Sequence, residues 1–193
     1  MAKKKEQKKY NNVLGIDLGG STRNGLALYS IDNHQLIDYV TVSRRDSKSN
    51  LAHRKNIINE INNLHDKYNI DILLFESIRL FSYGRIQLPT ILSLNKVQTT
   101  IINEFSEIFD IYQVDVRAWK SRVLSNGNAD KFESITFVKH KYPNVNLLDE
   151  IVKPIKKEIV FEINHDIADA ICISHCLNID YSILQEKNKM NFK

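Results

Sequence analysis

The feature that most constrains the fold is an apolar run at residues 13–16 that ends in a single aspartate, Asp17. Gly19 and Gly20 follow almost directly, and a second apolar run occupies residues 26–31. This pattern predicts a β-hairpin whose first strand is buried on both faces. A carboxylate there is costly to desolvate unless it is paired or binds a cation, and the glycines leave the backbone open to a phosphate or a metal. The alternative is a buried aspartate that only caps a turn, and partners elsewhere in the chain must decide between the two.

Length and composition favour one cytoplasmic domain. A chain of 193 residues can bury the core of one α/β domain and is short for two. The hydrophobic (42%) and charged (26%) fractions are ordinary, no apolar run could span a bilayer, and no secretory signal is recognisable. Cys172 and Cys176 are spaced as neighbours on a helix, so we expect reduced cysteines in the core rather than a zinc site.

The net charge of +4 comes mostly from the lysine-rich N-terminus. We expect residues 1–11 to form a disordered basic arm, which either contacts phosphate or serves solubility alone. The remainder is close to neutral, so charge alone does not argue for a nucleic-acid partner. We expect the folded domain to span residues 12–180 and residues 181–193 to form a frayed tail.

The hydrophobic periodicity predicts an α/β fold around a mixed five-stranded sheet, with three antiparallel strands followed by two parallel ones and helices on its flanks. The strand at 71–75 is apolar throughout and therefore central. The segment 153–158 is polar, and we expect it to be irregular. The expected strands are 13–16, 25–31, 35–42, 71–75 and 111–116, and the expected helices are 51–68, 89–109, 129–142 and a last one that opens at Asp166.

Three further acids stand at the edges of these elements. Glu76 follows the central strand, where open α/β sheets place their ligands. Asp166 and Asp169 are three residues apart at a helix start and share one face, which exceeds what capping requires. Together with Asp17 they would repel one another unless hard divalent cations lay between them. Such a cluster suits two magnesium ions about 4 Å apart that hydrolyse a phosphodiester.

Basic and aromatic residues are candidates for nucleic-acid contact. The loop at 78–88 alternates the two kinds, which can stack on bases and pair with phosphates, or can instead fold back onto the core. A second group flanks a turn that contains Gly127, where a solvated surface is the alternative to a phosphate contact. The candidates are Arg79, Phe81, Tyr83 and Arg85 in the loop, and Arg117, Lys120, Arg122 and Lys131 around the turn.

Four segments in this order resemble the RuvC family of Holliday junction resolvases, which have a ribonuclease H-like fold. The resemblance covers about residues 12–178 and extends to phage-encoded members, which act in the host cytoplasm. The segments are Gly15-Ile16-Asp17-Leu18-Gly19, Phe75-Glu76, Trp119-Lys120 with Gly127-Asn128-Ala129-Asp130-Lys131, and His165-Asp166-Ile167-Ala168-Asp169-Ala170.

The resemblance implies a homodimer that cuts opposed strands of a four-way DNA junction with magnesium or manganese. The metal-binding acids of the family fall on Asp17, Glu76, Asp166 and Asp169, and its two lysines near the scissile phosphate fall on Lys120 and Lys131. The helix at 89–109 is one candidate for the dimer interface. The loop after Glu76 has no clear match to the base-stacking segment of the family, and Phe81 or Tyr83 is the candidate for that role.

Three other functions remain open. The opening Ile16-Asp17-Leu18-Gly19-Gly20-Ser21-Thr22 also looks like the phosphate loop of sugar kinases and actin-like ATPases, but these need a second such domain. A nuclease of the same fold that processes structured RNA would use the same acids. A catalytically inactive protein that binds branched DNA is the third, against which the presence of all four acids argues.

Overall fold

The computed structural model describes residues 9–19, 23–78, 88–153, 158–179, 181–184 and 188–190. Its centre is one five-stranded sheet in the order β3-β2-β1-β4-β5. The first three strands are antiparallel, and β4 and β5 run parallel to β1. The predicted mixed sheet is thereby confirmed. The strands are β1 (Asn12–Asp17), β2 (Arg23–Ser30), β3 (Gln35–Ser43), β4 (Ile72–Glu76) and β5 (Asp110–Val114).

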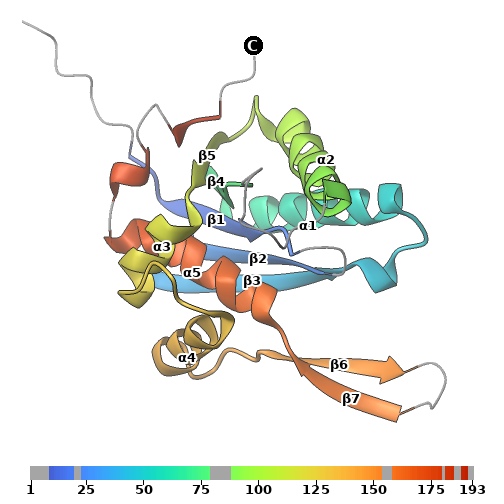
Figure 1. Cartoon of the computed structure of the whole chain (residues 1–193). Coiled ribbons are helices and arrows are strands. Elements are labelled where there is room, and N and C mark those ends of the chain that lie inside the picture. Colours follow the sequence, from blue (N-terminus) through green and yellow to red (C-terminus); the bar gives the residue numbers. More distant parts are fainter. Residues whose placement is uncertain are drawn as a thin grey trace, which may run out of the picture.

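Helices cover both faces of the sheet (Figure 1). The pleat of β1 directs Leu14 and Ile16 into a core that includes side chains of α1 (Asn50–Tyr68) and α2 (Leu88–Phe105). Val13 faces the opposite core, which contains side chains of α3 (Val116–Leu124), α4 (Lys131–Lys141) and α5 (His165–Ile179). Because both faces of β1 are covered, the strand reads as an unbroken apolar run.

Short polar side chains cap the starts of α1, α3 and α4. Ser49 accepts a hydrogen bond from the Ala52 amide at the start of α1. Asp115 does the same for Arg117 in α3, and Asp130 forms a capping box with Glu133 at the start of α4. These caps fix where α3 and α4 begin, and therefore where Lys120 and Lys131 lie.

Helix α5 lies directly against the backbone of β1. A Cβ atom on Gly15 would stand 2.6 Å from both the Ala170 carbonyl oxygen and the Ser174 amide nitrogen. No side chain fits into that space, so glycine at this position sets the separation of helix and strand.

Two strands lie outside the predicted sheet. β6 (Leu148–Lys153) and β7 (Glu158–Ile163) pair antiparallel and form a two-stranded ribbon. Figure 1 shows this ribbon projecting away from the five-stranded sheet. The expectation of an irregular segment at 153–158 is therefore corrected at both of its ends, while residues 154–157 lie outside the described residues. Apolar residues occupy every second position of β7 from Ile159 to Ile163, whereas β6 shows no such alternation, and the lysines and the proline between the strands obscure the pattern in the sequence.

The ends of the domain also differ from expectation. Within the predicted arm, residues 1–8 lie outside the described residues, but Tyr10 is buried and its hydroxyl donates to Asp110 over 2.8 Å. Within the predicted frayed tail, Tyr181–Leu184 forms a 3-10 helix in which Ile183 is buried. Lys189 forms a 2.6 Å ion pair with Asp110, so Tyr10 and Lys189 both contact the first residue of β5. None of the helices in the described ranges is long and apolar enough to cross a membrane.

The contact between α5 and β1 predicts a large effect for one added methyl group. We expect Gly15→Ala to lower the free energy of unfolding by about 1–3 kcal/mol, because backbone atoms of α5 must move. The melting temperature should fall by roughly 2–4 °C for each kcal/mol in a chain of this size.

Gly127→Ala is the matched control for this measurement. A Cβ atom there comes no closer than 3.3 Å, to the Arg117 carbonyl oxygen, so the variant should lose much less stability. Equal losses in the two variants, measured by thermal unfolding, would contradict a close approach of α5 to β1.

Candidate functional site

The four acids singled out in the sequence lie together at one end of the five-stranded sheet. Ile16 of β1 pairs with Phe75 of β4, so the residues that follow, Asp17 and Glu76, end adjacent parallel strands. Asp166 and Asp169 lie in the first turns of α5, which packs against β1 and β2. Each carboxylate is close enough to at least one other to affect its charge state.

Mutual repulsion and burial both act on these carboxylates. Burial raises the pKa of Asp17 well above the ordinary aspartate value, and the nearby charges of Asp169, Glu76 and Asp166 raise it further. Burial is also the largest cause of the raised pKa of each of the other three carboxyls. The cluster therefore holds more negative charge than its surroundings neutralise, which is the condition that favours a bound cation.

Two glycines allow the strands to approach Asp166. A Cβ atom on Gly19 would overlap the Asp166 carboxylate, and one on Gly25 would overlap the Asp166 main-chain carbonyl. Gly25 is also the partner of Asp17 in the pairing of β1 with β2. These glycines therefore bring the start of α5 next to the end of β1, which unites the two halves of the cluster.

Trp119 orients Glu76. The indole is fully buried, and its Nε1 donates a hydrogen bond to Glu76 Oε2 over 2.8 Å. This bond lowers the pKa of Glu76 against the larger effect of burial, which raises it. Trp119 stood inside a quoted motif, but the sequence gave it no role, because its partner Glu76 is 43 residues away.

Both predicted lysines lie close enough to the cluster to lower the pKa of its carboxyls. Lys131 lowers the pKa of Asp17 and Asp166, and Lys120 lowers that of Glu76. Lys120 Nζ also donates to the Ala129 carbonyl over 2.6 Å, which holds the chain before α4 against α3. Lys131 itself is exposed and so is open to a ligand.

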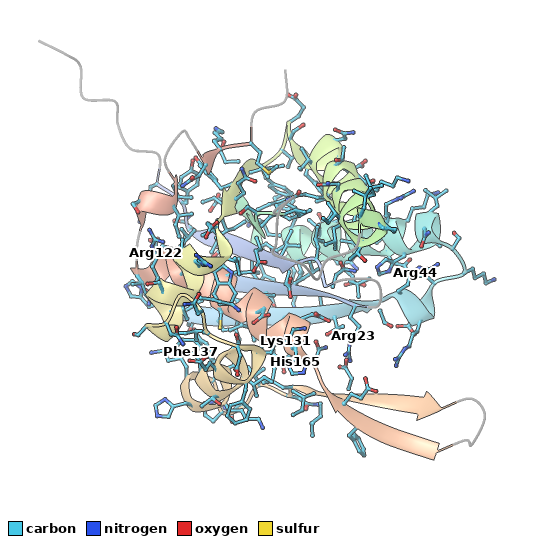
Figure 2. All side chains as sticks on the ribbon, viewed as in Figure 1. Arg23, Arg44, Arg122, Lys131, Phe137 and His165 are labelled. Carbon is cyan, nitrogen blue, oxygen red and sulfur yellow. The ribbon has the colours of Figure 1, made fainter. Side chains whose placement is uncertain are left out.

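The remaining basic candidates are less closely grouped. Arg117 is exposed on α3 near the Gly127 turn. Arg122 contacts the Ser182 hydroxyl over 3.4 Å, and Figure 2 shows it apart from Lys131 and His165. The loop candidates Arg79, Phe81, Tyr83 and Arg85 lie outside the described residues.

Arg23 is a site residue that the sequence reasoning missed. Its guanidinium lies 2.8 Å from Asp149 on β6, 3.6 Å from Asp166 and 3.8 Å from Glu162 on β7. Figure 2 shows Arg23 beside Lys131 and His165 at the cluster. Arg23 lowers the pKa of Asp166 and joins the ribbon to the start of α5. No spacing rule could have found it, since Asp149 is 126 residues away.

The donor set fits divalent metal ions. Carboxylate oxygens are the ligands that magnesium and manganese prefer. Asp169 Oδ1 is buried and has no hydrogen-bond partner of good geometry among the described residues, while the nearby Ser134 hydroxyl lowers the pKa of this carboxyl. Among the described residues, no three His, Cys, Asp or Glu side chains are grouped as they would be around a metal ion. The fit to a metal therefore rests on the chemistry of the four carboxylates rather than on a formed coordination shell.

Comparisons with known proteins show the fold. No protein-family model matches the sequence, and no curated protein does. The solved structure of RuvC from Thermus thermophilus is 16% identical, with a TM-score of 0.58 over 86% of this chain and 92% of that one. The same protein in complex with a Holliday junction substrate is 15% identical, with a TM-score of 0.64 over 94% and 100% of the two chains. The yeast mitochondrial Holliday junction resolvase Ydc2 is 16% identical, with a TM-score of 0.51 over 86% and 77%. The predicted ribonuclease H-like fold is confirmed.

The raised pKa of Asp17 predicts how stability depends on charge and metal. A carboxyl whose pKa is raised by folding stabilises the fold below the ordinary aspartate pKa and loses that contribution as the pH rises. At pH 8 without metal, we expect Asp17→Asn to unfold a few degrees above the wild type, at roughly 2–4 °C per kcal/mol. Manganese should stabilise the wild type, and it should stabilise the variant less.

Asp66→Asn is the control, because Asp66 is exposed on α1 far from the cluster. That variant should keep the wild-type melting temperature and the wild-type response to manganese. A metal-free Asp17→Asn protein that is less stable than the wild type would contradict net repulsion within the cluster.

The bond from Trp119 predicts a positioning effect. Trp119→Phe keeps a buried ring but removes the donor to Glu76, so we expect manganese affinity to fall by about tenfold, as for other groups that orient metal ligands. Because the bond lowers the pKa of Glu76, manganese binding should also require a higher pH in the variant. Calorimetric titrations at several pH values measure both effects, and a loss of stability with unchanged metal binding would reduce Trp119 to a core residue.

Proposed function

We propose that this chain is a metal-dependent endonuclease that hydrolyses phosphodiester bonds in Holliday junctions and related branched DNA. One observation carries the proposal. At one end of the sheet, four carboxylates lie together with two lysines beside them: Asp17, Glu76, Asp166 and Asp169, with Lys120 and Lys131. Acids that repel one another serve no evident structural purpose there, whereas a pair of divalent cations would neutralise them.

The four carboxylates would hold two magnesium or manganese ions. When bound, such ions supply an activated water and stabilise the leaving oxygen of a phosphodiester. The protein groups do the rest. Trp119 keeps Glu76 turned toward the cluster, and Lys120 and Lys131 would offset the charge that develops on the phosphate in the transition state.

The choice of branched DNA is supported by the likeness in fold to RuvC, whose structure in complex with a Holliday junction substrate is known. Arg117, Arg122 and Lys131 are candidates for contact with the phosphate backbone, which positions a nucleic acid without reading its sequence. A homodimer would place two sites on one junction. Helix α2 is our candidate interface, since Leu88 at its start is exposed.

Cleavage assays test this function directly. Wild type would be incubated with a labelled four-way junction, a three-way branch, a linear duplex and a structured RNA, each with magnesium and with chelator. We expect paired cuts in opposite strands of the junction that need magnesium. Asp17→Asn should abolish cutting and leave junction binding largely intact.

Two lysines on α4 provide a matched pair for the same assay. Lys131→Gln should weaken both cutting and binding, whereas Lys139→Gln, which removes an exposed charge from the same helix, should change neither. Cutting of RNA alone would support an RNA-processing nuclease instead. Tight junction binding without any cutting would support a catalytically inactive binding protein, and wild-type cutting rates in Asp17→Asn would refute the site.

A further inference from the structure

A basic cavity lies on the face of the sheet opposite α5, apart from the acid cluster. It has a volume of about 360 Å³, and its described lining comes from the first two turns of α1, from residues 89–97 of α2, and from Asn24 and Arg44. Its polar lining comprises Asn24, Arg44, Asn50, His53, Arg54, Ser93 and Lys96.

Three cations line this cavity without an acidic partner. Arg44, Arg54 and Lys96 form no ion pair with any described residue, and the described part of the lining contains no carboxylate. Arg44 is held in place, because its Nε donates to Asn50 Oδ1 and its terminal nitrogen to the Ser47 carbonyl, each over 2.9 Å. The Nε of Arg54 is buried without a hydrogen-bond partner among the described residues. The cavity thus concentrates positive charge that nothing described neutralises.

The surroundings of His53 also indicate an excess of positive charge in the cavity. It is only 6% exposed, and Asn24 Nδ2 donates to its Nε2 over 2.7 Å. Burial lowers the pKa of His53, and the nearby Arg44 charge lowers it further. A further cation is therefore disfavoured in the cavity, and an anion is favoured.

The cavity lies next to the acid cluster through β2. Asn24 lines the cavity, while its neighbours Arg23 and Gly25 contact Asp166 from the other face of the sheet. Arg23 also pairs with Ser43 in the sheet, and Arg44 follows directly. Figure 2 shows Arg23 and Arg44 at the same end of the sheet. The cavity and the acid cluster thus lie at the same end of β2, on opposite faces of the sheet.

We propose that this cavity binds a phosphate group of the nucleic-acid strand, at a position beside the one that is cut. Arg54 and Lys96 would contact the phosphate oxygens, and Arg44 would hold the rim of the site. The identity of the strand rests on the proposed function, whereas the preference for a phosphate rests on the cavity itself. The site would fix how the strand enters the acid cluster.

Junction binding in chelator tests the proposal without any cutting. We expect Arg54→Gln and Lys96→Gln each to weaken junction affinity by about tenfold, the contribution of one charge-assisted hydrogen bond. Each should also reduce the slope of log affinity against log salt by about 1, the loss of one phosphate contact. Lys55→Gln is the control, since it removes an exposed charge from the residue next to Arg54 on α1. Its affinity and slope should match the wild type.

Inorganic phosphate distinguishes a free ligand from the strand. Phosphate should raise the pKa of His53, followed by NMR of its ring, in the wild type and not in Arg54→Gln. If phosphate does so but the cavity variants bind the junction normally, the site takes a free phosphate and the strand assignment falls. Equal losses in Lys55→Gln and Arg54→Gln would also overturn it. If the wild type cuts no substrate but the cavity variants still lose junction affinity and slope, the proposed function fails and this site stands.

Discussion

The close packing of α5 on the backbone of β1 and β2 is the constraint on which the rest of the structure depends. Gly15, Gly19 and Gly25 leave no side chain between the helix and the strands. At one end this contact buries the centre of the molecule, and at the other it brings Asp166 beside Asp17. The same glycines therefore serve packing and chemistry, because a helix held one methyl group further away would separate the two pairs of acids.

The acid cluster lowers the stability of the fold, although the proposed function requires it. Four carboxylates that burial and repulsion keep at raised pKa are unfavourable to ionise, and Lys120, Lys131 and Arg23 offset only part of that cost. A protein selected for stability alone would replace some of these acids. Their presence in a closely packed corner is the feature on which the proposed cation site rests.

The sequence predicted the elements that carry local signals. Asp17 and Glu76 were found because each ends an apolar strand, and Asp166 and Asp169 because their spacing exceeds what a helix cap needs. Contacts between distant segments carried no such signal. Arg23 with Asp149, Trp119 with Glu76, and Tyr10 with Asp110 depend on how the finished fold brings remote residues together. The β6–β7 ribbon was missed for a different reason, since its two strands flank a lysine-rich stretch that reads as a loop.

The guanidinium of Arg23 is shared between Asp166 and the base of the β6–β7 ribbon. The ribbon projects from the domain (Figure 1), and the ion pair of Arg23 with Asp166 links its base to the acid cluster. Thermodynamic reciprocity then applies: whatever displaces the ribbon changes the field at Asp166, and whatever occupies Asp166 changes the freedom of the ribbon. Through Arg23, the position of the β6–β7 ribbon and the occupancy of the acid cluster are thus coupled.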